Sequence, residues 1–279
     1  MADTYAINFL TFRQFNAKFC LTYRSMKSLL LFLSATMLAP SIALADQRPV
    51  EIHDQLATTH DSGKMVALTL DACSGKYDGD LIDFLIKNQI PATIFATKRW
   101  LDRNPHGLSV IKSHLDLFDV ENHGEKHIPA VIGAGREIYG IPGEPDVVHL
   151  RREVVEGARA VKKATGIAPH WYRDATAEYD EQSVKEIDRL GYKIAGFSVN
   201  ADHGATSSKI TIEKRLRRVK AGDVIIAHMN KPDSDSAEGL AAGLAYLLKS
   251  GFVFVRLDQV DLKELPEKSV QKIDGKPGH

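Results

Sequence analysis

Two histidines four residues apart, His123 and His127 in the segment His-Gly-Glu-Lys-His, form the most specific chemical pattern in this sequence. On a helical turn this spacing places both imidazole rings on one face, where they can bind one metal ion. The alternative is two surface histidines on a loop, and an isolated pair would favour it. Here the pair directly follows a strand-like segment and accompanies other polar strand ends, which favours a metal site.

Polar side chains also end several other strand-like segments. Asp71 can act as a metal ligand or as a general base. The guanidinium of Arg173 can hold a carboxylate bidentately and keep it ionised. His228 can protonate a leaving amine, and Asn200 with Asp202 follows a further segment. The structural alternatives are a strand-end cap for the aspartate, a rim salt bridge for the arginine and a core histidine bonded to backbone.

These side chains need a scaffold that brings strand ends together. From residue 65 onward, β-like runs alternate with helical segments, which indicates an α/β fold with parallel pairing. The expected strands are Met65–Leu70, Ala92–Ala96, Leu115–Val120, His170–Tyr172, Tyr192–Val199, Val224–Ala227 and Phe252–Val255. The expected helices are Leu81–Lys87, Leu108–Ser113, Val147–Thr165, Glu181–Leu190, Ile210–Val219 and Ser236–Leu248. About seven units predict a parallel (β/α) barrel, with an open doubly wound sheet as the alternative.

In this order the motifs resemble those of the polysaccharide deacetylases, the NodB-homology domains of carbohydrate esterase family 4. The resemblance covers about residues 64–260. The matching motifs are Thr-Leu-Asp at 69–71, Asn-His-x-x-x-His at 122–127, the aromatic-Arg turn at 172–173 and Gly-Asp-x-Ile-x-x-His at 222–228. The segments 90–95 and 190–199 give further support.

The resemblance implies a distorted (β/α) barrel and a divalent metal ion, often zinc. It also implies hydrolysis of N-acetyl, sometimes O-acetyl, groups on chitin-like, peptidoglycan or exopolysaccharide chains. By position, the resemblance implies that Asp71 is the base that activates water and that Arg173 orients this base. It implies that His228 is the general acid, tuned by Asp202, and that His123 and His127 are metal ligands.

The third metal ligand is where the sequence departs most from this family. Ala72 occupies the position of the usual ligating aspartate, and Cys73 follows it. Asp71, which we predict as the third ligand, Cys73 or Asp78 could complete the site. The alternative is that metal binding is weak or lost.

Residues 1–45 have the composition of an N-terminal extension followed by a secretory signal peptide. A basic lysine leads into an apolar run, and Ala-Leu-Ala then supplies the small residues that signal peptidase reads. We expect Met26 to be the true start, cleavage after Ala45 and a single deacetylase-like domain over 46–279. Pro40 interrupts the apolar run, so a membrane anchor is the weaker alternative. We therefore expect a secreted or periplasmic protein with no stable membrane anchor after cleavage.

The amino-acid composition limits the classes of binding partner that we expect. The chain is 44% hydrophobic and 26% charged, as is usual for a packed globular protein. Its 36 basic residues balance 36 acidic ones, and cleavage of the basic prefix leaves a slightly acidic remainder. No basic face for nucleic acid is indicated. Cleavage also removes Cys20, so Cys73 has no partner for an internal disulfide.

The sequence thus predicts an exported metal-dependent hydrolase of non-peptide carbon–nitrogen bonds, acting on an acetylated cell-envelope or extracellular polysaccharide. Alternatives are a metal-free glycan-binding pseudoenzyme, a small-amide metal hydrolase on the same barrel, and a structural envelope protein. Ala72 leaves the first alternative open, and the shortage of aromatic residues near the barrel mouth leaves the second open. The third explains the signal peptide but not the polar strand ends. Residues 174–176 and Gly204 also lack the family's usual prolines, aromatic residue and tryptophan.

Overall fold

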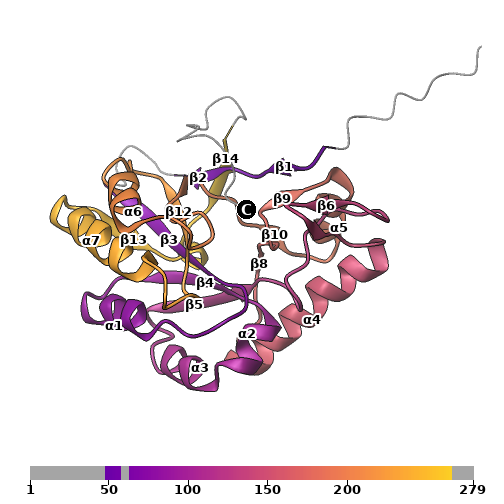
Figure 1. The fold of residues 1–279 in the computed structure, drawn as a ribbon, viewed down its shortest axis with the longest axis horizontal. Coiled ribbons are helices and arrows are strands. Elements are labelled where there is room, and N and C mark those ends of the chain that lie inside the picture. The colour runs from indigo at the N-terminus through magenta and orange to yellow at the C-terminus, as the bar shows by residue number, and fades with distance from the viewer. Residues whose placement is uncertain (1–47, 58–62, 266–279) are drawn as a thin grey trace, which may run out of the picture. The chain divides into compact units, whose positions relative to one another are not determined.

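The computed structural model describes residues 48–57 and 63–265, which form a curled parallel sheet with helices along its outer side (Figure 1). The predicted signal peptide and the polar tail from residue 266 lie outside these residues. The helices are α1 (Gly79–Lys87), α2 (Lys98–Arg103), α3 (Pro105–Lys112), α4 (Val147–Thr165), α5 (Glu181–Arg189), α6 (Lys209–Leu216) and α7 (Ser236–Lys249). The strands of the main sheet are β3 (Met65–Ala72), β4 (Ala92–Ala96), β5 (Phe118–Asn122), β8 (Trp171–Tyr172), β10 (Lys193–Ile194), β11 (Val199–Asn200), β12 (Val224–His228) and β13 (Val253–Val255).

The sheet follows the order β10-β8-β5-β4-β3-β12-β11, and every pairing in it is parallel. β13 also pairs with β3, along residues 65–67, whereas β4 pairs with residues 69–72 of the same strand. The two strands at the ends of this order, β10 and β11, are consecutive in the chain. The sheet therefore curls until both edges belong to one segment, and the predicted distorted (β/α) barrel is confirmed.

That closing segment differs from the sequence prediction. We expected one strand over Tyr192–Val199, but it is divided between β10 and β11. The N–H of Gly196 donates to Asp54 Oδ2 at 2.8 Å, and a Cβ on Gly196 would lie 2.5 Å from the Ile52 carbonyl oxygen. The N-terminal segment therefore packs against the middle of the expected strand and takes up the Gly196 N–H.

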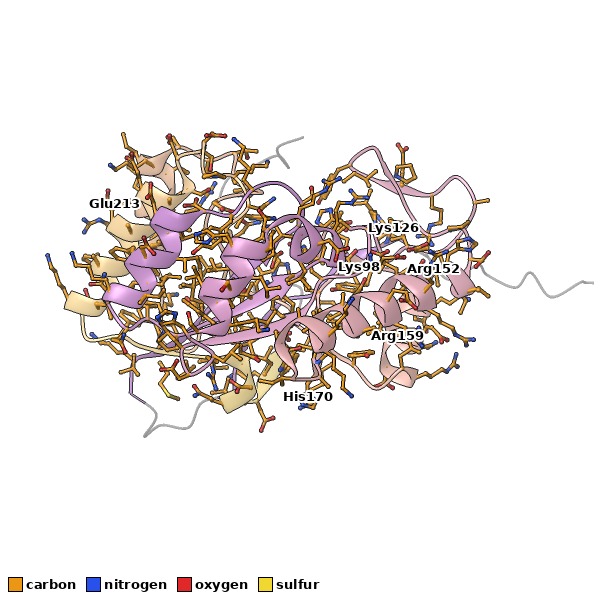
Figure 2. All side chains as sticks on the ribbon, turned by 90° about the horizontal axis from the view of Figure 1, so that it is seen from below. Lys98, Lys126, Arg152, Arg159, His170 and Glu213 are labelled. Carbon is orange, nitrogen blue, oxygen red and sulfur yellow. The ribbon has the colours of Figure 1, made fainter. Side chains whose placement is uncertain are left out.

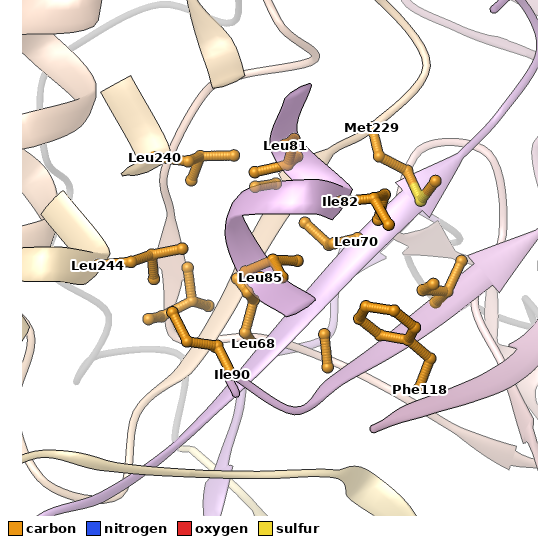
Figure 3. Packing of buried hydrophobic residues seen from close by; sticks show 14 of the residues in the cluster. Leu68, Leu70, Leu81, Ile82, Leu85, Ile90, Phe118, Met229, Leu240 and Leu244 are labelled. Atoms are coloured by element: carbon orange, nitrogen blue, oxygen red, sulfur yellow. The ribbon is translucent and has the colours of Figure 1, made fainter. Parts of the chain in front are cut away.

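The buried strands explain why the barrel forms and which side chains face its interior. Every residue of β4 is buried, and all of β3 except Met65, as expected for parallel strands covered on both faces. Alternate residues of β3 face opposite sides. Leu68 and Leu70 pack outward against the helices (Figure 3), whereas Ala67 packs with Phe95 inside the barrel. Asp71 shares the inward face.

Helix ends are defined by the expected local chemistry. α4 has the predicted bounds because Asp146 caps its first turn and Gly166, with φ of +84°, ends it in a left-handed conformation. Asp78 caps α1 by accepting the Leu81 N–H at 3.1 Å. This occupies one oxygen of a carboxylate that was a candidate third ligand.

Several short elements were not predicted. They are α2 and three small antiparallel pairs: β1 (Val50–Glu51) with β9 (Glu178–Tyr179), β2 (Asp54–Leu56) with β14 (Leu262–Glu264), and β6 (Glu137–Ile138) with β7 (Ile141–Pro142). β5 begins at Phe118, three residues later than expected. Among the helices of the described residues, none has the length and apolar character needed to cross a membrane.

Candidate metal and active site

The two predicted histidines meet where β5 ends. Their ring centroids are 4.9 Å apart, and the rings stand at 71° to each other. The connection is an irregular loop, not the helical turn we expected, because Gly124 and His127 have φ angles of +87° and +69°. The expected conformation is therefore wrong, although the predicted proximity of the rings is present.

Cys73 joins this pair. Its sulfur and one nitrogen from each of His123 and His127 all lie within 4.8 Å of one another. Cys73 Sγ is 3.5 Å from His123 Nε2, and His123 Nδ1 bonds to the Arg173 carbonyl oxygen at 2.8 Å. Three possible metal-ligand atoms, referred to below as the donor set, thus lie close together. His127 contributes a ring whose Nε2 is buried and has no hydrogen bond within the described residues.

Asp71 lies beside these donors and is held by Arg173. Its Oδ1 accepts from Arg173 Nη1 at 2.9 Å, and its Oδ2 lies 3.8 Å from His123 Nε2. The fully buried guanidinium also donates to Thr69 Oγ1 and lies 4.3 Å from the centroid of the Phe95 ring. The predicted aspartate–arginine pair is therefore formed. The role of Asp71 as base or ligand stays a prediction.

His228 and Asp202 form the second charge pair. His228 lies opposite Asp71 in the register of β12 and β3. Asp202 Oδ1 is 2.9 Å from His228 Nδ1, and its Oδ2 accepts the His228 backbone N–H at 2.9 Å and the Ser236 hydroxyl at 3.0 Å. Asp202 is completely buried, so these contacts replace its hydration.

The electrostatics follow from this packing. Burial alone would raise the pKa of the Cys73 thiol, yet His127, His123 and His228 together lower it well below its usual value. Burial alone would lower the pKa of His123, but Asp71 and Cys73 raise it to about 9. Burial likewise opposes ionisation of Asp202, whose pKa nevertheless falls because of His228. Asp202 and Cys73 raise the pKa of His228 well above its usual value, against burial.

All the predicted site residues therefore lie in one connected cluster: Asp71, His123, His127, Arg173, Asp202 and His228. One contributor was missed. Glu153 of α4 accepts backbone N–H groups of the histidine loop. Its signal was present in the sequence, because it is a glutamate on the apolar stripe of an amphipathic helix.

Comparison with known proteins gives a family match. Residues 58–195 match the model of a family described as polysaccharide deacetylase. No curated protein matches the chain.

The fold is similar to several solved structures. One is a mutant of BA3943 from Bacillus anthracis, a CE4 family pseudoenzyme with restored enzymatic activity; identity is 21%, coverage is 72% of this chain and 68% of that one, and the TM-score is 0.58. Another is the Bc1960 peptidoglycan N-acetylglucosamine deacetylase, at 21% identity, 74% and 90% coverage and a TM-score of 0.60. A third is PdaA of Bacillus subtilis, a family 4 carbohydrate esterase, at 23% identity, 74% and 83% coverage and a TM-score of 0.58.

Proposed function

Because this chain belongs to the polysaccharide deacetylase family, we propose that it is an exported, metal-dependent deacetylase of a cell-envelope or extracellular polysaccharide. The reaction removes N-acetyl or O-acetyl groups. The observation that carries the proposal is the donor set of Cys73, His123 and His127, flanked by the Asp71–Arg173 and Asp202–His228 pairs.

The residues present fit a zinc ion. Two imidazoles and a thiolate are preferred zinc ligands, and three protein ligands are usual where zinc is catalytic. The unpartnered His127 Nε2 supports this assignment. Cys73 is the third donor that closes the set, because its sulfur lies within 4.8 Å of a nitrogen of each histidine. Asp71 Oδ1 is instead bonded to Arg173. When bound, the ion would lower the pKa of a water molecule and polarise the acetyl carbonyl.

The surrounding residues supply the proton transfers. Arg173 donates to Asp71 and fixes its carboxylate beside the donor set, where it can take a proton from the attacking water. Asp202 holds His228 through Nδ1 and favours its protonated form, which can give a proton to the departing amine. An amide bond breaks slowly without that proton.

The family match and the similarity to Bc1960, a peptidoglycan N-acetylglucosamine deacetylase, support the proposed substrate class. A second candidate is a metal-free glycan-binding pseudoenzyme. Ala72 in place of the usual ligating aspartate favours it, as does the similarity to a family member that is itself a pseudoenzyme. Metal content separates the two candidates.

The test is metal content together with acetate release. We expect the purified protein to bind about one equivalent of zinc and to release acetate from at least one of chitin oligosaccharides, peptidoglycan and acetylated xylan. His127→Ala should weaken zinc binding by more than the ~10- to 100-fold typical of supporting residues, and should abolish acetate release. His106→Ala, on the exposed surface of α3, is the matched control. Activity without bound metal would refute the mechanism, and absence of both metal and activity would favour the pseudoenzyme.

Export is proposed from residues 1–45. Mass spectrometry of the protein recovered outside the cytoplasm should find Asp46 as its first residue. An intact N-terminus on a cytosolic protein would contradict export without affecting the proposed chemistry.

A further inference from the structure

A buried glutamate lies behind the histidine loop, residues 123–128. Glu153 is on the inward face of α4, where its neighbours Leu150, Val154 and Gly157 are apolar. It is only 2% exposed. A carboxylate is costly to bury, so its hydrogen-bond partners determine whether the position is stable.

Those partners are consecutive amides of the histidine loop. Glu153 Oε1 accepts the backbone N–H groups of Lys126 at 2.8 Å, His127 at 2.8 Å and Ile128 at 3.3 Å. The Glu153 carbonyl oxygen also accepts the Glu125 N–H at 3.0 Å. Successive N–H groups that converge on one anion form a concave backbone site, and bonds to an ionised acceptor are stronger than neutral ones.

The central amide belongs to a residue with an unfavourable backbone. His127 has a φ of +69°, in the left-handed region that side chains other than glycine rarely occupy. Such conformations persist only where surrounding contacts hold them. Since the backbone angles set the direction of the side chain, the hydrogen bond that the His127 N–H donates to Glu153 bears on where the His127 ring points.

Close packing leaves α4 little freedom to move away from the loop. A Cβ on Gly157 would lie 2.3 Å from Asn122 Oδ1 and 2.6 Å from the Gly124 carbonyl carbon. Asn122 Nδ2 donates to the Val154 carbonyl oxygen at 2.9 Å. On the surface, Lys126 of the loop and Arg152 of α4 lie close together (Figure 2), and both contact Glu125.

We propose that Glu153 is a positioning residue, which holds His127 in the orientation that brings its ring to Cys73 and His123. Its consequence for metal binding rests on the proposed function, whereas its control of the ring orientation does not. Glu153 touches no donor atom of the set and acts only through the loop backbone.

The first test is zinc affinity, measured by competition with a chromophoric chelator. Glu153→Ala should weaken binding by ~10- to 100-fold, the range for residues that orient a ligand. Glu153→Gln keeps an acceptor oxygen and should stay within a few-fold of the wild type. Glu156→Ala, on the same helix and bonded to Arg159 at its surface, should change nothing. Affinity of Glu153→Ala equal to that of the wild type would overturn the proposal.

The second test needs no metal. In NMR spectra, a nuclear Overhauser effect between the ring protons of His123 and His127 should be seen in the metal-free wild type and in Glu153→Gln. It should be lost in Glu153→Ala. Ring contact kept in a folded Glu153→Ala would overturn the proposal. Should Glu153→Ala fail to fold, Glu153→Asp replaces it, because aspartate keeps the charge but places its oxygens farther from the loop. Loss of the ring contact in Glu153→Asp would support the proposal, and retention would overturn it. A wild type that binds no zinc would contradict the proposed function, while the ring measurement would still decide the role of Glu153.

Discussion

Two groups of buried charged side chains lie along strand β5, and they differ in how the charges of their carboxylates are compensated. His123, directly after the end of β5, lies beside the Asp71 carboxylate and the Cys73 sulfur. There Asp71 is bonded to Arg173, and Asp202 is bonded to His228. Asp71 and Asp202 therefore each have a partner of opposite charge.

Asp119 and Glu121 of the same strand line a cavity of about 480 Å³ with His170, Lys193 and Arg256, and none of the candidate site residues lines it. Burial and the adjacent Asp119 raise the pKa of Glu121 to about 8, although its Oε2 accepts the N–H groups of His170 and Trp171. Burial and Asp258 raise the pKa of Asp119 to about 6. Asp119 Oδ2 is buried without a partner within the described residues.

The difference teaches how to separate a reactive site from a merely buried one. A carboxylate compensated by an opposite charge is available as a base, whereas one compensated by its own proton is not. Perturbed pKa values occur in both groups of residues, so perturbation alone does not distinguish them. The pattern of partners distinguishes the two.

Arg173→Met should have the largest effect on stability. It leaves Asp71 as an uncompensated buried charge and should cost about 3–5 kcal/mol of unfolding free energy. Unfolding in guanidinium chloride measures this loss of unfolding free energy. Arg159→Met, at an exposed pair with Glu156, should cost less than ~1 kcal/mol.

Adding Asp71→Asn to Arg173→Met should recover part of the loss, because it removes the stranded charge. Equal costs for Arg173→Met and Arg159→Met would break the comparison, since pairing would then not stabilise the charges of the active end.

Glu121→Gln should have an effect of opposite sign, and one that depends on pH. The ordinary pKa of Glu121 is 4.5 and its folded value is about 8, so between these pH values the unfolded chain releases a proton that the folded protein keeps. Wild-type stability therefore falls as pH rises through this window, by at most ~1.4 kcal/mol per pH unit for one proton. Glutamine cannot ionise, so the variant should have a shallower decline and be more stable near pH 8.

Urea unfolding at several pH values measures these slopes. Glu213→Gln, on surface helix α6, is the control and should keep the wild-type slope. Parallel curves for Glu121→Gln and the wild type would show that Glu121 is ionised when folded, and would contradict this prediction.

Local signals predicted much of the fold. The bounds of α4 and β4 follow from caps and buried runs within each segment. The division of Tyr192–Val199 could not be predicted, because its cause is contact with Asp54, far away in the sequence. The conformation of the histidine loop likewise depends on a carboxylate from α4.

The site was predictable to the same extent. Parallel strands meet at their carboxyl ends, so Asp71, His123, Arg173 and His228 could be grouped without coordinates. From the sequence we predicted Asp71 as the third ligand, with Cys73 and Asp78 as alternatives. The sequence alone could not show that the Cys73 sulfur would lie beside both histidines while Asp71 bonds to Arg173, because both depend on tertiary packing.

Ser236→Ala should have the smallest effect, and it tests how evenly charge is compensated at the active end. The Ser236 hydroxyl, at the start of α7, is one of three donors to Asp202, and the other two come from His228. Its loss should cost about 1 kcal/mol, the usual net value of one hydrogen bond. Acetate release should stay within a few-fold, because the contact that orients His228 remains. Asp202→Asn is the matched contrast: it removes the charge opposite His228 and should reduce both stability and acetate release further. If the serine variant lost as much as Asp202→Asn, the neutral hydroxyl and not the histidine would be the main compensation for Asp202, and this carboxylate would resemble those at the other end of the barrel.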